Sequence, residues 1–374
     1  MNKNRLIRIL QVGMSPYYGG TEAFLMSQYR VIDKTKIQFD FLNVYKEKIA
    51  CQDEIVNMGG RIYYLDMARH RGVKRYYQNI DTFFKKNANQ FDIVHCNYQS
   101  LINTDILKYA KKNGIKVRIA HAHNSGYGVE PSNRQKFLIF LNRITIKRYA
   151  TNFFACSSLA AEWMFKTKAT IIKNAIDVDK YIFSSQEREK VRRQLEFNDQ
   201  EIILFVGRLD PQKNPLFLID IFREIKVKKQ DSMLVIVGEG YLKDEITAKI
   251  VEYKLENDVK ILGTRNDVNE LLQAADIFVL PSRFEGLGIA LVESQAAGLP
   301  TFTTKDVVPD DVKITDLLEF VPVNASAKEW ATRILCADTM TRKNMGNQVR
   351  MAGYDNYENA KNLESLYLSF LNSK

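Results

Sequence analysis

Short apolar runs alternate along the chain with longer segments in which apolar residues recur every three to four positions. Runs of the first kind predict buried β-strands and segments of the second kind predict helices. In the first half of the chain we expect strands at 6–12, 37–43, 62–65, 93–96, 117–121, 152–156 and 170–172. Helical patterns lie between them, the longest at about 133–149. Such alternation predicts a parallel sheet covered by helices.

The same alternation starts again near residue 202, with expected strands at 202–206, 233–237, 259–262 and 277–280. A chain of 374 residues exceeds the size at which one hydrophobic core serves the whole protein. We therefore expect an α/β protein of two domains.

The stretch 276–302 holds a short apolar strand, a polar loop and an apolar helix that ends at Gly298. Glu285 lies in the loop, and Glu293 is the one carboxylate of the helix. A lone buried carboxylate is costly unless strong donors meet it. Gly286 and Gly288 let the backbone approach a ligand and leave amide groups at the positive end of the helix. Two carboxylates in one pocket would accept hydrogen bonds from the hydroxyls of a sugar or ribose.

Two cations follow the strand at 202–206. Gly207 and Arg208 come directly after it, and Lys213 lies five residues further on. Arginine binds phosphate through its planar fork and lysine as a point charge, so the pair predicts a clamp for a diphosphate. A surface salt-bridge cluster is the alternative.

Two further segments of the first half could bind a ligand. Gly19 and Gly20 end the loop after the first strand, where a helix start can hold phosphate, although a plain strand-to-helix turn gives the same pattern. His121 and His123 share one face of an extended strand and lie where open α/β sheets bind ligands. A structural histidine is the alternative, and no third ligand for a zinc ion is evident.

At these residues the chain resembles the retaining, family 4 (group 1) nucleotide-sugar glycosyltransferases of the GT-B fold. The segment EGLGIALVESQAAGLP is most similar to members of the branch that builds capsular and extracellular polysaccharides. The resemblance implies two Rossmann-like domains whose parallel sheets face each other across a cleft. It assigns 1–176, with a final helix at about 355–374, to an acceptor-binding domain and 177–354 to a domain that binds the nucleotide-sugar donor.

The resemblance also assigns roles to individual residues. It places the donor sugar on Glu285, the ribose on Glu293, and His123, or failing that His121, near the donor sugar and the acceptor. The remaining donor-binding positions that it implies are Gly19, Gly20, Arg208, Lys213, Thr264, Arg265, Gly286, Leu287 and Gly288.

The expected reaction moves a hexosyl unit from a nucleoside diphosphate sugar to a hydroxyl acceptor, a lipid-linked saccharide, with retention of configuration. We expect no metal ion and no cofactor, because Arg208, Lys213 and amides near Gly20 would neutralise the leaving diphosphate. Two alternatives remain: a nucleotide-sugar epimerase of the same architecture, or a basic nucleic-acid-binding protein, for which no known motif is present.

Charge is distributed unevenly. The net charge of the chain is +10, yet residues 1–176 alone carry 28 Lys and Arg against 12 Asp and Glu. Such a basic half fits an anionic membrane surface, an acidic acceptor or nucleic acid. We expect membrane contact at the basic and aromatic segment 66–78, with help from the helix at 133–149; a solvated loop is the alternative. Without a long apolar run, the expected location is the cytoplasm, at the inner face of the cell membrane.

Overall fold

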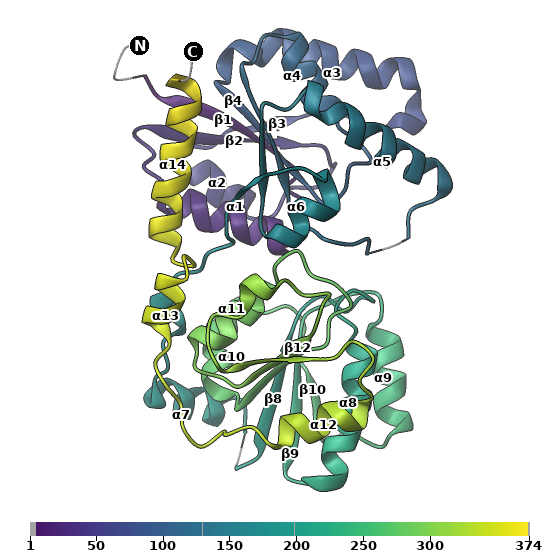
Figure 1. The fold of residues 1–374 in the computed structure, drawn as a ribbon, viewed down its shortest axis with the longest axis vertical. Helices are drawn as coiled ribbons and strands as arrows, with labels where there is room; N and C mark the ends of the chain where they lie inside the picture. Colours follow the sequence, from purple (N-terminus) through teal and green to yellow (C-terminus); the bar gives the residue numbers. More distant parts are fainter. Residues whose placement is uncertain (1–4, 129, 198, 373–374) are drawn as a thin grey trace. The chain divides into compact units, whose positions relative to one another are not determined.

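The structure is a computed structural model that describes residues 5–128, 130–197 and 199–372. It divides into two compact units. The N-terminal unit comprises Met1–Ala175 and Asn356–Lys374, and the C-terminal unit comprises Ile176–Asp355. Each unit is a parallel sheet covered by helices, which confirms the predicted α/β class (Figure 1).

The sheet of the N-terminal unit has seven strands in the order β3-β2-β1-β4-β5-β6-β7, all parallel. The strands are β1 (Ile7–Val12), β2 (Ile37–Asn43), β3 (Ile62–Tyr64), β4 (Ile93–Tyr98), β5 (Val117–Ala122), β6 (Asn152–Ala155) and β7 (Thr170–Ile171). The helices are α1 (Gly20–Val31), α2 (Gln52–Asn57), α3 (Val73–Asn87), α4 (Asp105–Lys112), α5 (Asn133–Thr145), α6 (Ser158–Phe165) and α14 (Asn356–Asn372). Single 3₁₀ turns are η1 (Arg69–Arg71), η2 (Ala88–Gln90) and η3 (Ile146–Arg148), so the helical pattern at 133–149 ends as a 3₁₀ turn.

Helix α14 belongs to the core of the N-terminal unit although it comes last in the chain. Figure 1 shows it beside α1, on the opposite side of the sheet from α3 and α4. Its residues Leu363 and Tyr367 join the same buried cluster as Phe24, Phe39 and Phe154. Burying this apolar stripe removes it from water and holds the end of the chain on the first unit.

The sheet of the C-terminal unit has six parallel strands in the order β10-β9-β8-β11-β12-β13. These are β8 (Glu201–Val206), β9 (Ser232–Val237), β10 (Val259–Ile261), β11 (Ile277–Leu280), β12 (Thr301–Thr304) and β13 (Leu318–Val321). The helices are α7 (Ser185–Gln194), α8 (Pro215–Lys228), α9 (Lys243–Glu252), α10 (Val268–Ala274), α11 (Ile289–Ala296), α12 (Ala327–Leu335) and α13 (Gly346–Met351). The 3₁₀ turns are η4 (Val178–Tyr181) and η5 (Asp310–Val312).

In both sheets the strand order reverses between two central neighbours. These are β1 and β4 in the first sheet, and β8 and β11 in the second. Chain segments leave such neighbours in opposite directions, which opens a crevice at the carboxyl ends of the strands. The fold therefore offers one ligand-binding edge in each unit.

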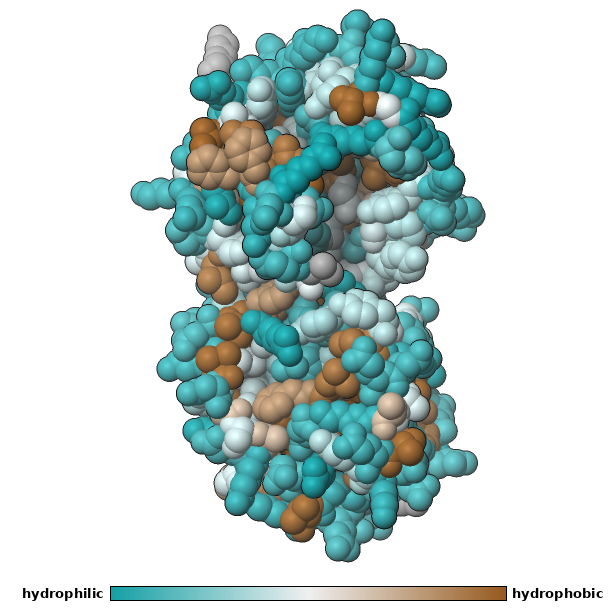
Figure 2. Space-filling view, turned by 90° about the vertical axis from the view of Figure 1, so that its right-hand side faces the viewer, coloured by the Kyte–Doolittle hydropathy of each residue, from teal (hydrophilic) through white to brown (hydrophobic). Residues whose placement is uncertain are grey.

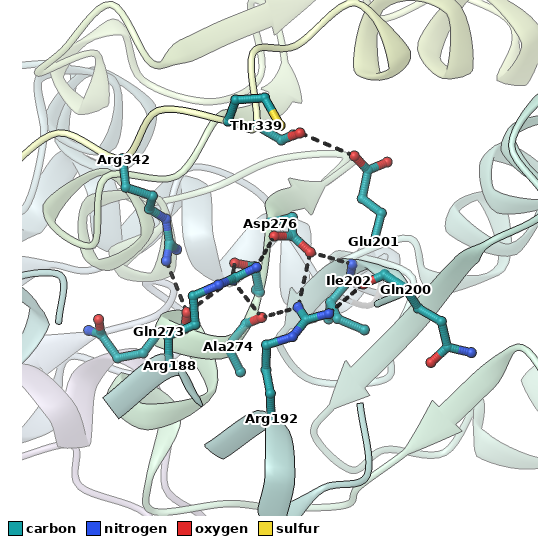
Figure 3. A network of polar contacts seen from close by, with 12 residues as sticks. Arg188, Arg192, Gln200, Glu201, Ile202, Gln273, Ala274, Asp276, Thr339 and Arg342 are labelled. Carbon is teal, nitrogen blue, oxygen red and sulfur yellow. Dashed lines mark hydrogen bonds and ion pairs between the residues drawn. The ribbon is translucent and has the colours of Figure 1, made fainter. Parts of the chain in front are cut away.

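The amino ends of β8 and β11 are held by a polar network instead (Figure 3). The carboxylate of Asp276 accepts bonds from Arg188 at 2.5 Å and from the Ile202 amide at 2.7 Å, and Arg192 lies 3.3 Å away. Arg342 donates to two carbonyls at the end of α10, and its burial lowers its pKa to about 9. The network ties α7 and the segment before α13 to the sheet, at the end away from the crevice.

Candidate active site

The centre of the candidate site is an ion pair between the loops that follow β8 and β11. The Nζ atom of Lys213 lies 2.6 Å from Oε1 of Glu285, and the hydroxyl of Ser282 donates to the same oxygen at 2.6 Å. Glu285 is 3% exposed. A buried carboxylate of this kind persists because a cation and a hydroxyl both satisfy it. Ser282 was missed from the sequence, although it lies only three residues before Glu285.

Arg208 lies on the same loop as Lys213 but faces solvent. Its guanidinium is 3.1 Å from a carboxylate oxygen of Asp210 and donates to Gln212 at 2.9 Å, while 59% of the side chain stays exposed. Two neighbours orient the group without covering it. A guanidinium with five N–H donors, oriented and open, suits an incoming phosphate.

A glycine allows the loops after β8 and β9 to touch. A Cβ atom on Gly238 would lie 1.9 Å from the carbonyl oxygen of Gly207, and the φ of Gly238 is +142°. Only glycine fits such a contact and such a backbone. The close approach fixes the start of the segment that carries Arg208.

Glu293 lies on α11 and is partly buried. The hydroxyl of Tyr181 donates to its Oε1 at 2.8 Å. Burial raises the pKa of Glu293, and the hydrogen bond from Tyr181 opposes that rise. Tyr181 comes from η4, more than a hundred residues earlier, and no local pattern in the sequence indicates the contact.

The other predicted donor-side positions differ in how they are held. Gly288 precedes α11 with a φ of +86°, so the amino end of this eight-residue helix begins at the loop of Glu285. Gly286 and Leu287 complete that loop, and Leu287 is buried. After β10, Thr264 is exposed, and Arg265 pairs with Asp267 at 2.5 Å.

The glycine loop of the N-terminal unit contains its own anion. Gly20 is the first residue of α1, and Glu22 accepts hydrogen bonds from the amides of Ser15 at 2.7 Å and Gly19 at 3.1 Å. One amide that was expected to serve a phosphate is thus engaged by a carboxylate. A Cβ on Gly20 would meet nothing within 4 Å, so space beside Gly20 remains open.

His121 and His123 lie on one face of β5 and its extension, as their spacing predicts. Their ring centroids are 4.0 Å apart, and His95 of β4 stacks on His121 at 5.2 Å. All three are buried, and burial is the largest cause that lowers each pKa, for His95 and His123 to about 3. The three imidazoles are therefore neutral near pH 7. His95 was missed because it lies in the middle of a strand.

A surface hollow of about 260 Å³ is lined by residues that follow these histidines closely in the sequence. It is formed by the loops after β4 and β5 and by the start of α5. Its lining residues include Gln99, Asn124, Gln135 and Tyr127. Amides and an aromatic face are groups that can contact a polar, ring-shaped molecule.

Comparisons with known proteins place the chain in a family. Residues 187–352 match the model of the glycosyl transferases group 1. Over 373 residues the chain is 30% identical to a protein of Bacillus subtilis described as the putative glycosyltransferase EpsF, and the match covers 96% of each chain. The chain belongs to the group 1 glycosyl transferases.

Other relatives of this group 1 glycosyl transferase act in related settings, by their descriptions. One is the UDP-Gal:alpha-D-GlcNAc-diphosphoundecaprenol alpha-1,3-galactosyltransferase of Escherichia coli, 23% identical with 98% of each chain covered. Another is the capsular polysaccharide biosynthesis glycosyltransferase CapH of Staphylococcus aureus, 24% identical over 77% of this chain and 79% of CapH. The fold matches the crystal structure of Anabaena Alr3699/HepE in complex with UDP and glucose, with a TM-score of 0.79, 19% identity, and 97% and 100% of the two chains covered. This confirms the predicted GT-B fold.

In this group 1 glycosyl transferase the segment that matches the family model contains Arg208, Lys213, Glu285 and Glu293. The histidines and the glycine loop lie before that segment. Among the residues that the structure describes, no group of three or more His, Cys, Asp or Glu side chains is placed to hold a metal ion. No helix in the described part of the chain is both long and apolar enough to cross a bilayer.

Proposed function

We propose that the protein transfers a hexosyl unit from a nucleoside diphosphate sugar to a hydroxyl of a lipid-linked saccharide, with retention of configuration, in the synthesis of a capsular or extracellular polysaccharide. The observation that carries the proposal is the pairing of Lys213 with Glu285 beside the open guanidinium of Arg208, at the carboxyl ends of β8 and β11. The descriptions of EpsF, CapH and the E. coli galactosyltransferase support the setting.

In this proposal the C-terminal unit binds the donor. Arg208 and Lys213 contact the diphosphate and stabilise the negative charge that grows on it as the glycosidic bond breaks. Glu285, held by Lys213 and Ser282, accepts hydrogen bonds from sugar hydroxyls, and Glu293 accepts those of the ribose. Thr264 and Arg265 lie against the nucleotide base.

The N-terminal unit binds the acceptor, near His123. A neutral imidazole can accept a hydrogen bond from a hydroxyl, whereas a cationic one has only donors. Because side chains already neutralise the diphosphate, we propose that no metal ion and no cofactor takes part.

The proposal is tested with purified protein and a panel of nucleoside diphosphate sugars. A true donor should raise the unfolding temperature further as its concentration rises above its Kd, because it binds only the native state. With an undecaprenyl diphosphate saccharide present, that donor should yield free nucleoside diphosphate and an elongated saccharide whose new bond keeps the anomeric configuration of the donor. An inverted product would exclude retention. A donor converted to its epimer without acceptor would establish the epimerase alternative, and salt-sensitive binding of DNA or RNA without any turnover would favour the nucleic-acid alternative.

We also propose that α5 docks on an anionic membrane where the acceptor is presented. Phe137, Phe140, Leu141 and Ile144 are 60%, 57%, 39% and 56% exposed. Positions spaced by three, four and seven residues share one helix face, so the four form an apolar stripe. Figure 2 looks onto the side where α5 lies in Figure 1 and shows brown and tan atoms gathered among hydrophilic ones on the N-terminal unit.

Basic residues flank this apolar stripe. Arg134 and Lys136 precede it, Lys147 and Arg148 follow it, and all four are exposed. An apolar face between cations fits an interface of acyl chains and anionic headgroups, where each basic residue contributes roughly 1 kcal/mol.

The segment 66–78, expected from the sequence to make this contact, is built differently. Tyr76 is 1% exposed, and its hydroxyl lies 2.9 Å from Asp105. Arg69 pairs with the same carboxylate at 2.6 Å, and Arg71 pairs with Asp66 at 3.1 Å. On α5 itself, Arg143 donates to main-chain carbonyls of α6 instead of facing outward.

Vesicle flotation separates the two surfaces. The wild type should float with anionic vesicles at low salt and dissociate as salt rises. Changing Phe137, Phe140 and Ile144 to serine should abolish flotation, whereas changing Arg71, Lys74 and Arg75 to glutamate should leave most of it. The reverse result would return the contact to segment 66–78, and a wild type that never floats would refute membrane docking.

A further inference from the structure

Six buried polar side chains of the N-terminal unit form one hydrogen-bonded array, which extends from β1, β4 and β5 to α14. Its members are Gln11, His95, Asn97, His121, His123 and Tyr367. All are at most 8% exposed. Buried polar groups are normally placed so that each donor faces an acceptor, which allows the protons to be assigned one after another.

The assignment starts at a main-chain carbonyl. The side-chain amide of Asn97 lies 3.1 Å from the carbonyl oxygen of Val12, which can only accept, so the atom that faces Val12 is the NH₂ group. The other atom of that amide, Oδ1, then faces Nε2 of His123 at 2.8 Å. His123 must donate there, so it carries its proton on Nε2 and leaves Nδ1 as a bare acceptor.

The second branch of the array runs through Gln11. Asn97 donates to Oε1 of Gln11 at 3.1 Å, so the NH₂ group of Gln11 faces the hydroxyl of Tyr367, at 3.4 Å. That hydroxyl accepts a hydrogen bond from Gln11 and donates its own to Nδ1 of His95, 2.8 Å away. His95 is therefore protonated on Nε2.

The tautomer of His95 determines that of His121. Its Nε2–H group points at Nδ1 of His121, 3.1 Å away, so His121 is also protonated on Nε2. Burial lowers the pKa of all three imidazoles, so each keeps a single proton near pH 7. The array ends in two buried atoms that have no partner among the described residues: Nε2 of His121, a donor, and Nδ1 of His123, an acceptor.

We propose that Tyr367 and Asn97 are positioning residues that fix His121 and His123 in their Nε2–H tautomers, so that the two neighbouring rings offer one donor and one acceptor to hydroxyl groups of the reacting sugars. The inference rests on the proposed function for its last step, because only that function brings hydroxyls to this edge. Helix α14 thus has a role beyond packing, since its Tyr367 donates the hydrogen bond that fixes the tautomers of His95 and His121.

The array divides into branches that can be disturbed separately. Tyr367→Phe removes the proton donor of His95 and leaves the bond between Asn97 and His123 in place. Asn97→Leu removes the acceptor of His123 and the donor of Gln11. Tyr354→Phe is a matched control, because Tyr354 is also fully buried and its hydroxyl donates to a carbonyl, that of Asp311 at 2.7 Å in the C-terminal unit.

Long-range ¹H–¹⁵N correlation spectra of the full-length protein read the tautomers directly. The chain has only four histidines, and the exposed His70 is assigned by His70→Asn. We expect three Nε2–H signals from the wild type at pH 7. Tyr367→Phe should give mixed tautomers at His95 and His121 and leave His123 unchanged, Asn97→Leu should alter His123, and Tyr354→Phe should change none.

Activity then tests the last step. Tyr367→Phe should lower kcat by roughly tenfold with the donor KM within twofold of wild type, while Tyr354→Phe retains kcat. An unchanged tautomer pattern in Tyr367→Phe, or any wild-type ring protonated on Nδ1, would overturn the assignment. Altered tautomers with wild-type kcat would overturn the positioning role. The spectra do not depend on turnover, so a failure of the proposed function would appear as a wild type that transfers no hexose while its tautomers stay as assigned.

Discussion

The two sheets share a reversal of strand order but carry different polar side chains near it. Where the strand order reverses in the C-terminal unit, the loops after β8 and β11 carry a lysine, an arginine and a carboxylate. In the N-terminal unit, three neutral histidines and two amides lie on β1 and β4 and on β5 with its extension, and α14 adds the hydroxyl of Tyr367. One edge is built from ions and the other from neutral groups.

Burial explains the difference. A charge is tolerated in the interior only when it is paired and hydrogen-bonded, as Glu285 is by Lys213 and Ser282. The histidines have no carboxylate among the partners described above, so they remain neutral there. The charged edge suits a diphosphate, whose negative charge must be matched. The neutral edge suits hydroxyls, which need only a donor or an acceptor.

The largest effect should come from removing a cation at the charged edge. Arg208→Ala and Lys213→Ala should each lower kcat by on the order of a hundredfold or more, the range found when one contact to transition-state charge is lost. Lys213→Ala should also cost about 3 kcal/mol of stability, because it leaves Glu285 buried without its cation. Steady-state kinetics and denaturant unfolding check both effects.

Arg208→Ala should leave stability nearly unchanged, since most of its side chain is exposed. Lys229→Ala is the control for losing an ion pair, because Lys229 contacts Glu201 at the opposite end of β8, 2.7 Å away. Near-normal turnover of Arg208→Ala and Lys213→Ala would remove the clamp from the mechanism.

A smaller effect should distinguish the two carboxylates of the charged edge. Glu293→Gln should weaken binding of the nucleoside diphosphate by on the order of tenfold, since hydrogen bonds to a charged group contribute about 1.5–3 kcal/mol. Glu285→Gln should reduce sugar transfer more than affinity for the nucleoside diphosphate. Titration calorimetry measures the nucleotide affinity and steady-state kinetics the rate of sugar transfer. Equal losses of nucleotide affinity in the two variants would contradict the division of roles.

The same variant tests the pKa of Glu293. Because burial raises that pKa, the contribution of Glu293 to stability is full below the pKa of an unfolded glutamate and is lost as pH rises through the folded value. At pH 8 Glu293→Gln should thus unfold at the same temperature as the wild type or higher, despite binding nucleotide less well. Wild-type affinity should fall as acid protonates the carboxylate, and Glu293→Gln should show a flatter pH dependence.

The sequence indicated the charged edge better than the neutral one. Glu285, Arg208 and Lys213 lie in the loops that follow apolar strands, so their positions follow from strand ends and glycines. The bond between Gln11 and Tyr367 joins residues 356 positions apart, and no local pattern contains it. A usable signal was nevertheless present: Gln11, His95 and Asn97 interrupt strands that are otherwise apolar, and buried polar residues require partners.

In segment 66–78 the composition misled at one position, Tyr76. Basic and aromatic residues there resemble a membrane contact, but Tyr76 shares the buried face of α3 with Ile80, Phe83 and Phe84. The helical spacing of these four residues was visible in the sequence and would have placed Tyr76 inside. The stripe on α5 follows the same periodicity, and only the structure shows that it faces solvent, because a sequence does not reveal which apolar faces find a partner.

The smallest expected effect is that of removing divalent ions. The clamp of Arg208 and Lys213 already supplies two positive charges to the diphosphate, so we expect transfer rates in excess EDTA within about twofold of those with Mg²⁺. One Asp-x-Asp triplet, a spacing that can bind a metal, does occur at η4. Its Asp179 pairs with Arg350 at 2.5 Å and its Asp177 with Lys180 at 3.2 Å, so both carboxylates are matched by cations. Asp179→Asn should therefore retain activity, whereas complete loss of transfer in EDTA, restored by Mg²⁺ or Mn²⁺, would show that the charged edge is incomplete without a metal ion.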